Sequence, residues 1–275
     1  MQNAGIARLG LNWRYLAFEV HPDELRTAID GAKAMRFLGL NLTVPHKLLA
    51  KEMVDVLEES ARIWGSVNTI RFEGKDAAGE WKPLAEVEGS PHEVRSHGFN
   101  TDADAITRSL KEDLGLELRG KRALLLGAGG AGRTAALKLA EQGVAELFLV
   151  NRTVSKAEEL ALEIQEKHPG VSVKVGYPQG RIHLLLNATS LGLKEGDAVP
   201  LDQEAFSLKN AETVYDMIYR PAETTFLKTA KAAGCRTANG LGMLLYQGAK
   251  ALEIWSGKDA PIEIMREALQ KNVYG

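Results

Sequence analysis

The sequence predicts an α/β fold built mainly on parallel sheets. Helical and strand-like patterns alternate along the 275 residues, as expected when helices connect neighbouring strands. The clearest unit runs from Lys121 to Lys156, where a hydrophobic run, a glycine-rich turn, a helical pattern and a second hydrophobic run follow one another. The length allows two domains.

The first half of the chain is expected to contain short strands and helices in alternation. The expected strands are Trp13–Val20, Phe37–Leu42 and Val67–Phe72. The expected helices are Asn3–Leu9, one opened by His21-Pro22-Asp23, one beginning at Pro45, where a proline in the first turn is tolerated, and one over Asp102–Leu114. The polar segment Glu73–His97 is interpreted as an extended surface hairpin or loop.

The second half gives a more regular pattern. Strands are expected at Ala123–Leu126, Glu146–Val150, Val171–Val175, Ile182–Leu186 and Thr213–Ile218. Helices are expected over Ala131–Gln142 with Gly143 as the stop, from Pro221 to Gly234, and from Gly240 to the end, with Pro261 starting the last one.

Composition excludes several classes of function. With 34 Lys and Arg against 36 Asp and Glu, the net charge of -2 gives no reason to expect nucleic acid as a partner. The single cysteine, Cys235, rules out an internal disulfide, and no apolar run is long enough to span a bilayer. The N-terminus lacks the pattern of a signal peptide. A cytoplasmic protein is therefore expected, without a membrane partner or a metal site.

The turn Gly127-Ala128-Gly129-Gly130-Ala131-Gly132 has the pattern G-x-G-x-x-G. These glycines allow a tight turn, close approach of a pyrophosphate to the backbone, and close packing of the following helix on the strand. Free N–H groups at the start of that helix also favour anionic phosphates. Because a hydrophobic strand precedes the turn and a second strand follows at suitable spacing, the sequence predicts a dinucleotide site.

The residues after the second strand indicate which dinucleotide binds. An NAD site usually has an Asp or Glu there, which accepts hydrogen bonds from the ribose 2′-OH. This chain has Asn151-Arg152-Thr153, with Lys156 one turn later. Arg152 could be a solvated residue at the start of a helix, but cationic groups in place of the acid attract a 2′-phosphate, so NADP is predicted.

Three polar clusters occur where loops leave strands, the usual place for ligands in open α/β sheets. They are Asn41–Lys47, Gly65–Thr69 and Gly98–Asp102. Taken singly, each has an ordinary structural explanation. Asn68 could cap a turn, Asp102 could cap the next helix, and Lys47 could be a solvated lysine.

Taken together, these clusters resemble the motifs of the shikimate dehydrogenase family. The strings N-x-T-x-P-x-K, G-x-V-N-T and G-x-N-T-D occur in the family order and are followed by the glycine-rich turn. The remaining matching strings are Asn187–Gly192, Asp216–Pro221 and Gly240–Gln247. The resemblance covers essentially the whole chain from residue 3.

The resemblance implies the reversible reduction of 3-dehydroshikimate to shikimate by NADPH, a step of chorismate and aromatic amino-acid biosynthesis. Lys47 and Asp102 match the paired catalytic residues. A lysine can donate the proton that the developing alkoxide needs, and a neighbouring carboxylate can orient that lysine and bind an adjacent hydroxyl. The positions matching substrate-binding residues are Thr43, Asn68, Tyr219 and Gln247. The positions matching the cofactor site are Gly127, Gly129, Gly130, Ala131, Gly132, Asn151, Arg152, Thr153, Lys156, Thr189, Ser190, Met217 and Gly240.

The architecture implied by the resemblance is a Rossmann-like NADP domain and an α/β substrate domain with a cleft between them. The substrate domain is expected to comprise residues 1–103 and 240–275, and the NADP domain residues 104–239. The partner is a small-molecule substrate, and the protein is expected to be a monomer or homodimer.

The chain departs from the family pattern in three places. The family begins with a strand and a Ser-x-Ser-Pro segment whose serines hold the substrate carboxylate. Gln2-Asn3 aligns with the end of that segment, so two explanations stay open: the given start is internal to the natural gene, or the protein lacks the strand and both serines. The segment Glu73–His97 is lengthened, and Ala105 stands where glycine is common. Two alternatives stay open: a quinate/shikimate dehydrogenase, and an NADP-binding protein with impaired catalysis.

Overall fold

The computed structural model describes residues 1–194 and 196–275, which form two compact units. Unit 1 comprises Met1–Asp102 and Gln247–Asn272, and unit 2 comprises Ala103–Tyr246 and Val273–Gly275. The chain returns to unit 1 at Gln247, later than the predicted boundary at Gly240. Gly240 is held within unit 2, because its N–H donates to the carbonyl of Ile218 at 3.1 Å. The predicted α/β class is confirmed.

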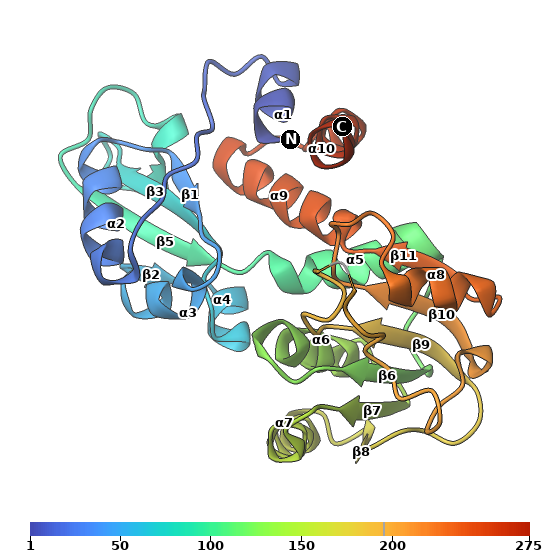
Figure 1. Cartoon of the computed structure of the whole chain (residues 1–275). Coiled ribbons are helices and arrows are strands. Elements are labelled where there is room, and N and C mark those ends of the chain that lie inside the picture. The colour runs from blue at the N-terminus through green and yellow to red at the C-terminus, as the bar shows by residue number, and fades with distance from the viewer. Residues whose placement is uncertain (195) are drawn as a thin grey trace. The chain divides into compact units, whose positions relative to one another are not determined.

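Unit 2 contains a six-stranded sheet in which every neighbouring pair is parallel, as predicted. Its order is β11-β10-β9-β6-β7-β8 (Figure 1). The strands are β6 (Arg122–Leu126), β7 (Glu146–Val150), β8 (Ser172–Val175), β9 (Ile182–Asn187), β10 (Ala211–Asp216) and β11 (Arg236–Asn239). The order reverses beside β6, the place where open parallel sheets bind ligands at the carboxyl ends of their strands.

Helices connect these strands. They are α5 (Asp102–Leu114), α6 (Gly130–Glu141), α7 (Val154–Lys167) and α8 (Thr225–Ala232), with a 3-10 turn at Leu208–Asn210. The first two crossovers, α6 and α7, contact each other and the strands β6 to β8, whereas α8 contacts β10 and β11. Crossovers between parallel strands are right-handed. The chain moves along the sheet in one direction from β6 to β8 and in the other from β10 to β11. Helix α8 therefore covers the face opposite to α6 and α7.

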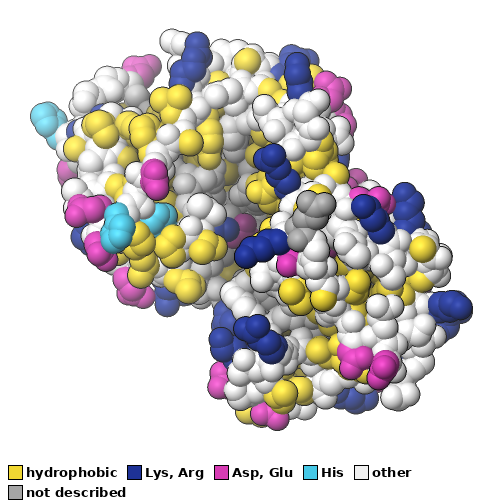
Figure 2. All heavy atoms as spheres, viewed as in Figure 1, with side chains coloured by type: hydrophobic (Ala, Val, Ile, Leu, Met, Phe, Trp, Pro, Cys, Tyr) yellow, Lys and Arg dark blue, Asp and Glu magenta, His cyan; other side chains and the backbone are white. Residues whose placement is uncertain are grey.

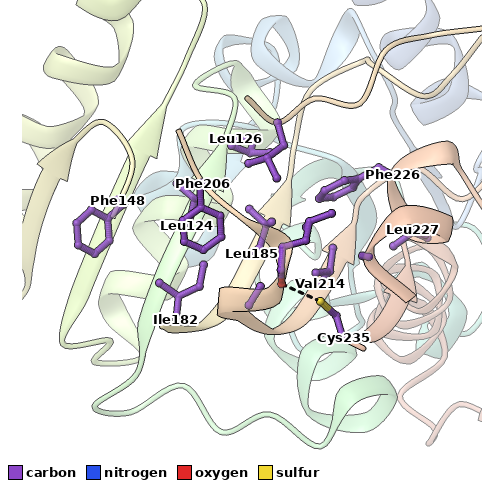
Figure 3. Packing of buried hydrophobic residues seen from close by; sticks show 14 residues of the cluster. Leu124, Leu126, Phe148, Ile182, Leu185, Phe206, Val214, Phe226, Leu227 and Cys235 are labelled. Carbon is purple, nitrogen blue, oxygen red and sulfur yellow. Dashed lines mark hydrogen bonds between the residues drawn. The ribbon is translucent and has the colours of Figure 1, made fainter. Parts of the chain in front are cut away.

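One buried hydrophobic cluster of unit 2 lies between the sheet and α8. Figure 3 shows Leu124, Leu185 and Val214, paired across three neighbouring strands, in one cluster with Phe226 of the helix. Such continuous apolar strands are typical of parallel sheets buried on both faces. Cys235 belongs to the same core, where its Sγ lies 3.3 Å from the carbonyl oxygen of Leu208 and burial raises the pKa of the thiol.

Unit 1 contains a second sheet, of order β1-β3-β5-β2 with β4 paired to β3. Its strands are β1 (Gly39–Asn41), β2 (Val56–Leu57), β3 (Thr69–Lys75), β4 (Trp81–Pro83) and β5 (Val94–Phe99). The pairs β1–β3, β3–β4 and β3–β5 are antiparallel, and only β2–β5 is parallel among the described strands of unit 1. The prediction of a mainly parallel sheet is therefore wrong for this unit.

The connections of the Glu73–His97 segment explain this difference. A tight turn with Gly79 at φ +85° joins β3 to β4, and a chain that reverses through a short turn must pair antiparallel. The hairpin interpretation holds for β3 and β4. It is wrong for β5, an inner strand paired on both sides, in which Ser96 is buried.

The expected strand Trp13–Val20 is also wrong, because residues 11–20 form neither helix nor strand. The backbone groups of Tyr15 are satisfied by a side chain instead of a neighbouring strand. The N–H of Tyr15 donates to Oδ1 of Asn3 at 2.8 Å, and Nδ2 of Asn3 donates to the carbonyl of Tyr15 at 2.9 Å. Asn3 itself lies in α1 (Gln2–Arg8), close to the predicted first helix.

The remaining helices of unit 1 are α2 (Leu25–Ala34), α3 (His46–Leu49) and α4 (Glu59–Trp64), with 3-10 turns at Pro22–Glu24, Ala50–Glu52 and Leu84–Glu86. Two C-terminal helices contribute residues to both units, α9 (Leu241–Ser256) and α10 (Ile262–Tyr274). In unit 1, Nε1 of Trp255 in α9 donates to the carbonyl of Ile70 in β3 at 2.9 Å. Within the described residues, no helix has the length and apolarity needed to cross a membrane.

A buried carboxylate, Glu73, joins strands β3 and β5. It accepts a hydrogen bond from Nε of Arg95 at 2.8 Å, lies 2.9 Å from Nδ1 of His97, and also pairs with Arg71. Burial alone would raise the pKa of this carboxyl group. The hydrogen bonds from His97, Arg71 and Arg95 outweigh burial and lower the pKa to about 2.

Replacing Glu73 with alanine is expected to reduce the free energy of unfolding by about 3 kcal/mol at neutral pH, because it leaves the partly buried Arg71 and Arg95 without their partner. Since the folded-state pKa lies below the ordinary value of 4.5, the stabilisation is present above pH 4.5 and is lost as the pH falls towards 2. Denaturant unfolding of parent and variant between these limits measures it. Glu93→Ala, which removes an exposed partner of Lys75, is the control. A constant difference between parent and Glu73→Ala across this range would contradict the assignment.

Candidate active site

Asn68 joins the three polar loops of unit 1. This buried residue lies just before β3, where its N–H donates to the carbonyl of Phe99 and its carbonyl accepts from the N–H of Leu42. Its side chain accepts a hydrogen bond from the N–H of Thr101 at 2.9 Å and donates one to Oγ1 of Thr101 at 2.9 Å. The ends of β1 and β5 and the start of β3 are thereby held together.

The same arrangement brings Lys47 and Asp102 into contact. Nζ of Lys47 donates to Oδ2 of Asp102 at 2.8 Å, and their side chains are 28% and 14% exposed. Lys47 lies in α3, with its carbonyl bound by the N–H of Val67, and Asp102 opens α5, with its N–H bound by Oδ1 of Asn100. The pair is fixed by its backbone yet partly open to a ligand, which suits a proton donor and its orienting carboxylate.

Asn100 and Thr101 were part of a predicted motif but had no predicted role. Nδ2 of Asn100 donates to Oγ of Ser66 at 2.9 Å, and its N–H donates to Oγ of Ser60 at 3.1 Å. Together with Asn68, these residues fix the loop that carries Asp102. In the sequence, Asn100 and Thr101 are visible only as polar residues just before a helix. Their hydrogen-bond partners lie far away in the chain, so the sequence could not identify them.

The four expected substrate-binding residues fall in different parts of the chain. Thr43 is exposed between β1 and α3, and Asn68 lies within the buried loop network. Gln247 is partly buried in α9 and belongs to unit 1. Tyr219 is exposed after β10 and belongs to unit 2.

In unit 2, the glycine-rich turn between β6 and α6 has the geometry that its pattern predicts. Gly127 has φ +100°, a conformation that favours glycine. A Cβ on Gly132 would lie 2.0 Å from the carbonyl oxygen of Gly127, so only glycine allows the helix to pack this closely. A Cβ on Gly129 or Gly130 would meet no atom within 4 Å, and Ala131 is exposed. This open space at the helix start fits a pyrophosphate.

Asn151 connects the end of β7 to this turn. Its Oδ1 accepts from the N–H of Ala128 at 3.0 Å, and its Nδ2 donates to the carbonyl of Thr153 at 2.8 Å. Arg152, Thr153 and Lys156 are exposed where α7 begins. Figure 2 shows Lys and Arg side chains gathered on unit 2 near α6 and α7. Within the described part of the chain, neither Arg152 nor Lys156 forms an ion pair, so both are available to a 2′-phosphate.

Two buried polar residues, Asn187 and Asp216, hold the loops after β9 and β10. Nδ2 of Asn187 donates to Oδ1 of Asp216 at 2.9 Å, and Oδ1 of Asn187 accepts from the N–H of Thr189 at 3.0 Å. Asp216 also accepts from Oγ1 of Thr224 at 2.7 Å and from the N–H of Ile218 at 3.1 Å. Burial raises the pKa of the Asp216 carboxyl. Both residues stood in predicted motifs without an assigned role.

An open cavity of about 870 Å³ lies beside the loop after β10. It is lined by Leu193, Met217, Ile218, Tyr219, Arg220, Pro221, Ala222, Leu244, Val273 and Tyr274. Two of these, Met217 and Tyr219, are predicted ligand residues. Gly240 supports the same loop, because a Cβ there would lie 2.0 Å from the carbonyl oxygen of Met217. The predicted residues Thr189 and Ser190 follow β9, the neighbouring strand.

Three family models match the chain. The shikimate dehydrogenase substrate binding domain matches residues 1–70, the shikimate/quinate 5-dehydrogenase model residues 109–173, and the shikimate 5′-dehydrogenase C-terminal domain residues 240–270. The NADP⁺ shikimate dehydrogenase of Methanopyrus kandleri is 37% identical over 99% of this chain and 90% of its own length.

Solved structures also resemble the chain over nearly its whole length. A shikimate dehydrogenase in complex with NADP⁺ is 34% identical, with a TM-score of 0.83 over 99% of this chain and 90% of its own. The ligand-free 5-ketofructose reductase of a Gluconobacter strain is 35% identical, with a TM-score of 0.79 over 98% of this chain and 92% of its own.

Proposed function

Because the chain belongs to the shikimate dehydrogenase family, we propose that it catalyses the reversible, NADP-dependent reduction of 3-dehydroshikimate to shikimate. The observation that carries this proposal is the 2.8 Å contact between Lys47 and Asp102 in unit 1. It accompanies, in unit 2, a glycine-rich turn and the exposed cations Arg152 and Lys156 where an NAD site would have an acid.

The proposed chemistry assigns one proton to Lys47. When bound, NADPH supplies hydride to the carbonyl carbon of the substrate, and the oxygen then develops negative charge. The Lys47 ammonium group donates a proton to this oxygen, and in the reverse direction the amine accepts it from the hydroxyl group. Asp102 orients the lysine through their hydrogen bond and accepts a hydrogen bond from an adjacent substrate hydroxyl.

The two units divide the binding of the ligands. Unit 1 binds the substrate through Thr43 and Asn68, assisted by Gln247. Unit 2 binds NADP, with the pyrophosphate at the start of α6. Asn151, Arg152, Thr153 and Lys156 bind the adenosine phosphate, and Thr189, Ser190, Met217 and Gly240 line the ribose and nicotinamide.

The composition also bears on the compartment and the partners of the enzyme. A nearly neutral net charge and a single buried cysteine support a cytoplasmic enzyme whose partners are small molecules. We propose that it acts as a monomer or homodimer.

Purified protein is expected to reduce NADP with shikimate, measured as NADPH absorbance, and to have a lower KM for NADP than for NAD. Quinate with NADP, and 5-ketofructose with NADPH in the reverse direction, serve as comparison substrates, because relatives of this fold act on them. Turnover of quinate with NAD in preference to shikimate with NADP would favour the quinate/shikimate alternative. Binding of NADP without turnover at millimolar shikimate would show an impaired NADP-binding protein.

A further inference from the structure

The last turn of α10 forms part of the wall of the unit 2 cavity. Val273 and Tyr274 line it together with the loop Met217–Ala222. Both residues belong to unit 2, although the preceding part of α10 belongs to unit 1. They lie beyond every sequence motif that points to a ligand, so the proposed function gives them no role.

The hydroxyl group of Tyr274 connects two segments beside the cavity. It donates to the carbonyl oxygen of Tyr219 at 2.9 Å and accepts from Nδ2 of Asn239 at 2.8 Å. The same Nδ2 donates to the carbonyl oxygen of Ala222 at 2.7 Å, and Oδ1 of Asn239 accepts from the N–H of Leu241. One tyrosine hydroxyl therefore ties the end of β11 to the loop after β10.

The first part of this loop has its own anchors. The N–H of Met217 donates to the carbonyl of Asn187 at 3.0 Å, and the N–H of Ile218 donates to the buried carboxylate of Asp216. Tyr219 is exposed and follows these anchors, so the Tyr274 hydroxyl holds the backbone at the point where the loop leaves the buried network.

The sheet order indicates which part of a dinucleotide meets this loop. The phosphate-binding cations follow β7, on one side of β6, whereas β9 and β10 lie on its other side. A dinucleotide laid across the carboxyl ends of these strands has its pyrophosphate at β6. With the adenosine phosphate beyond β7, the nicotinamide end reaches the loop after β10 and the cavity that Met217 lines.

We propose that Tyr274 is a positioning residue for the nicotinamide end of the cofactor site. This rests on the proposed function in that NADP is the cofactor. Its hydroxyl fixes the Tyr219 backbone and thereby the shape of the cavity, while the adenosine phosphate binds independently of it.

The test compares two ligands that share the adenosine phosphate. Tyr274→Phe removes only the hydroxyl, and is expected to raise the Kd for NADPH about fivefold, the value of one hydrogen bond, while the Kd for 2′,5′-ADP changes by less than about twofold. Tyr177→Phe is the matched control, because its hydroxyl accepts from the N–H of Asp202 at 3.0 Å elsewhere in unit 2. It should leave both Kd values unchanged.

Kinetics provide a second readout. Tyr274→Phe should raise the KM for shikimate and for NADP with little change in Tm, since the ring and its packing remain. Equal weakening of NADPH and 2′,5′-ADP, or unchanged binding and KM, would overturn the proposal. If the parent protein binds NADPH but does not oxidise shikimate, the proposed substrate is wrong, and the comparison of the two Kd values still decides the role of Tyr274.

Discussion

Replacing Lys47 with alanine is expected to lower kcat for shikimate oxidation by about 10³-fold, within the range of positioned acid–base groups. The variant has no side chain that can exchange the proton of the reacting oxygen. It also leaves the Asp102 carboxylate without the lysine that now lies 2.8 Å away. The measurement is steady-state kinetics with saturating NADP, followed by the Kd for NADPH, which should stay within about twofold of the parent value.

The fold should tolerate this substitution. The Lys47 side chain is 28% exposed, so its removal opens no sealed core cavity, and the carbonyl that anchors the loop belongs to the backbone. Lys51→Ala is the matched control, because Lys51 lies one turn later and pairs only at 3.6 Å with the exposed Glu52. An active Lys47→Ala enzyme, or an equal loss in Lys51→Ala, would refute the role of Lys47.

The second large effect is expected at Gly132. Gly132→Ala should reduce the free energy of unfolding of unit 2 by about 2–3 kcal/mol, as overpacking does, and should abolish measurable NADP binding. The new Cβ would lie 2.0 Å from the carbonyl oxygen of Gly127 and 2.8 Å from its carbonyl carbon. These are backbone atoms of the turn itself, so α6 must move away from the site where its N–H groups would meet the pyrophosphate.

Gly130→Ala separates the steric effect from the loss of a glycine in general. Gly130 is the first residue of α6, and a Cβ there would meet no atom within 4 Å. Thermal unfolding without ligand should show Gly130→Ala as stable as the parent and Gly132→Ala clearly less stable. If both variants unfold at the parent temperature, the close approach of Gly132 to the turn has no energetic consequence.

The sequence predicted unit 2 better than unit 1. The strands β6, β7 and β9 are largely apolar runs, and Glu146–Val150 and Asp102–Leu114 have the predicted bounds, whereas the polar strand β11 was not predicted. In unit 1, alternating hydrophobicity predicts extended backbone but not the direction of pairing. Trp13–Val20 shows a further limit: a strand needs a neighbour, and here Asn3 satisfies the Tyr15 backbone groups instead.

The candidate site was also predicted only in part. Lys47 and Asp102 were identified from local motifs and are in contact. Asn187 and Asp216 stood in predicted motifs without an assigned role, and only the structure shows that they bind each other. Tyr274 had no pattern to identify it, because its partners lie dozens of residues away and a tyrosine near the end of a helix is common.

The discontinuity of unit 1 sets the order in which a nascent chain can fold. Its sheet needs α9, since Trp255 donates to the carbonyl of Ile70 and a Cβ on Gly39 would lie 2.0 Å from the Trp255 indole nitrogen. That helix leaves the ribosome after nearly all of unit 2, whose residues 103–246 are contiguous. The first part of unit 1 is translated before unit 2 and its second part only after residue 246, so a chain cut short before α9 keeps most of unit 2 but leaves the sheet of unit 1 uncovered.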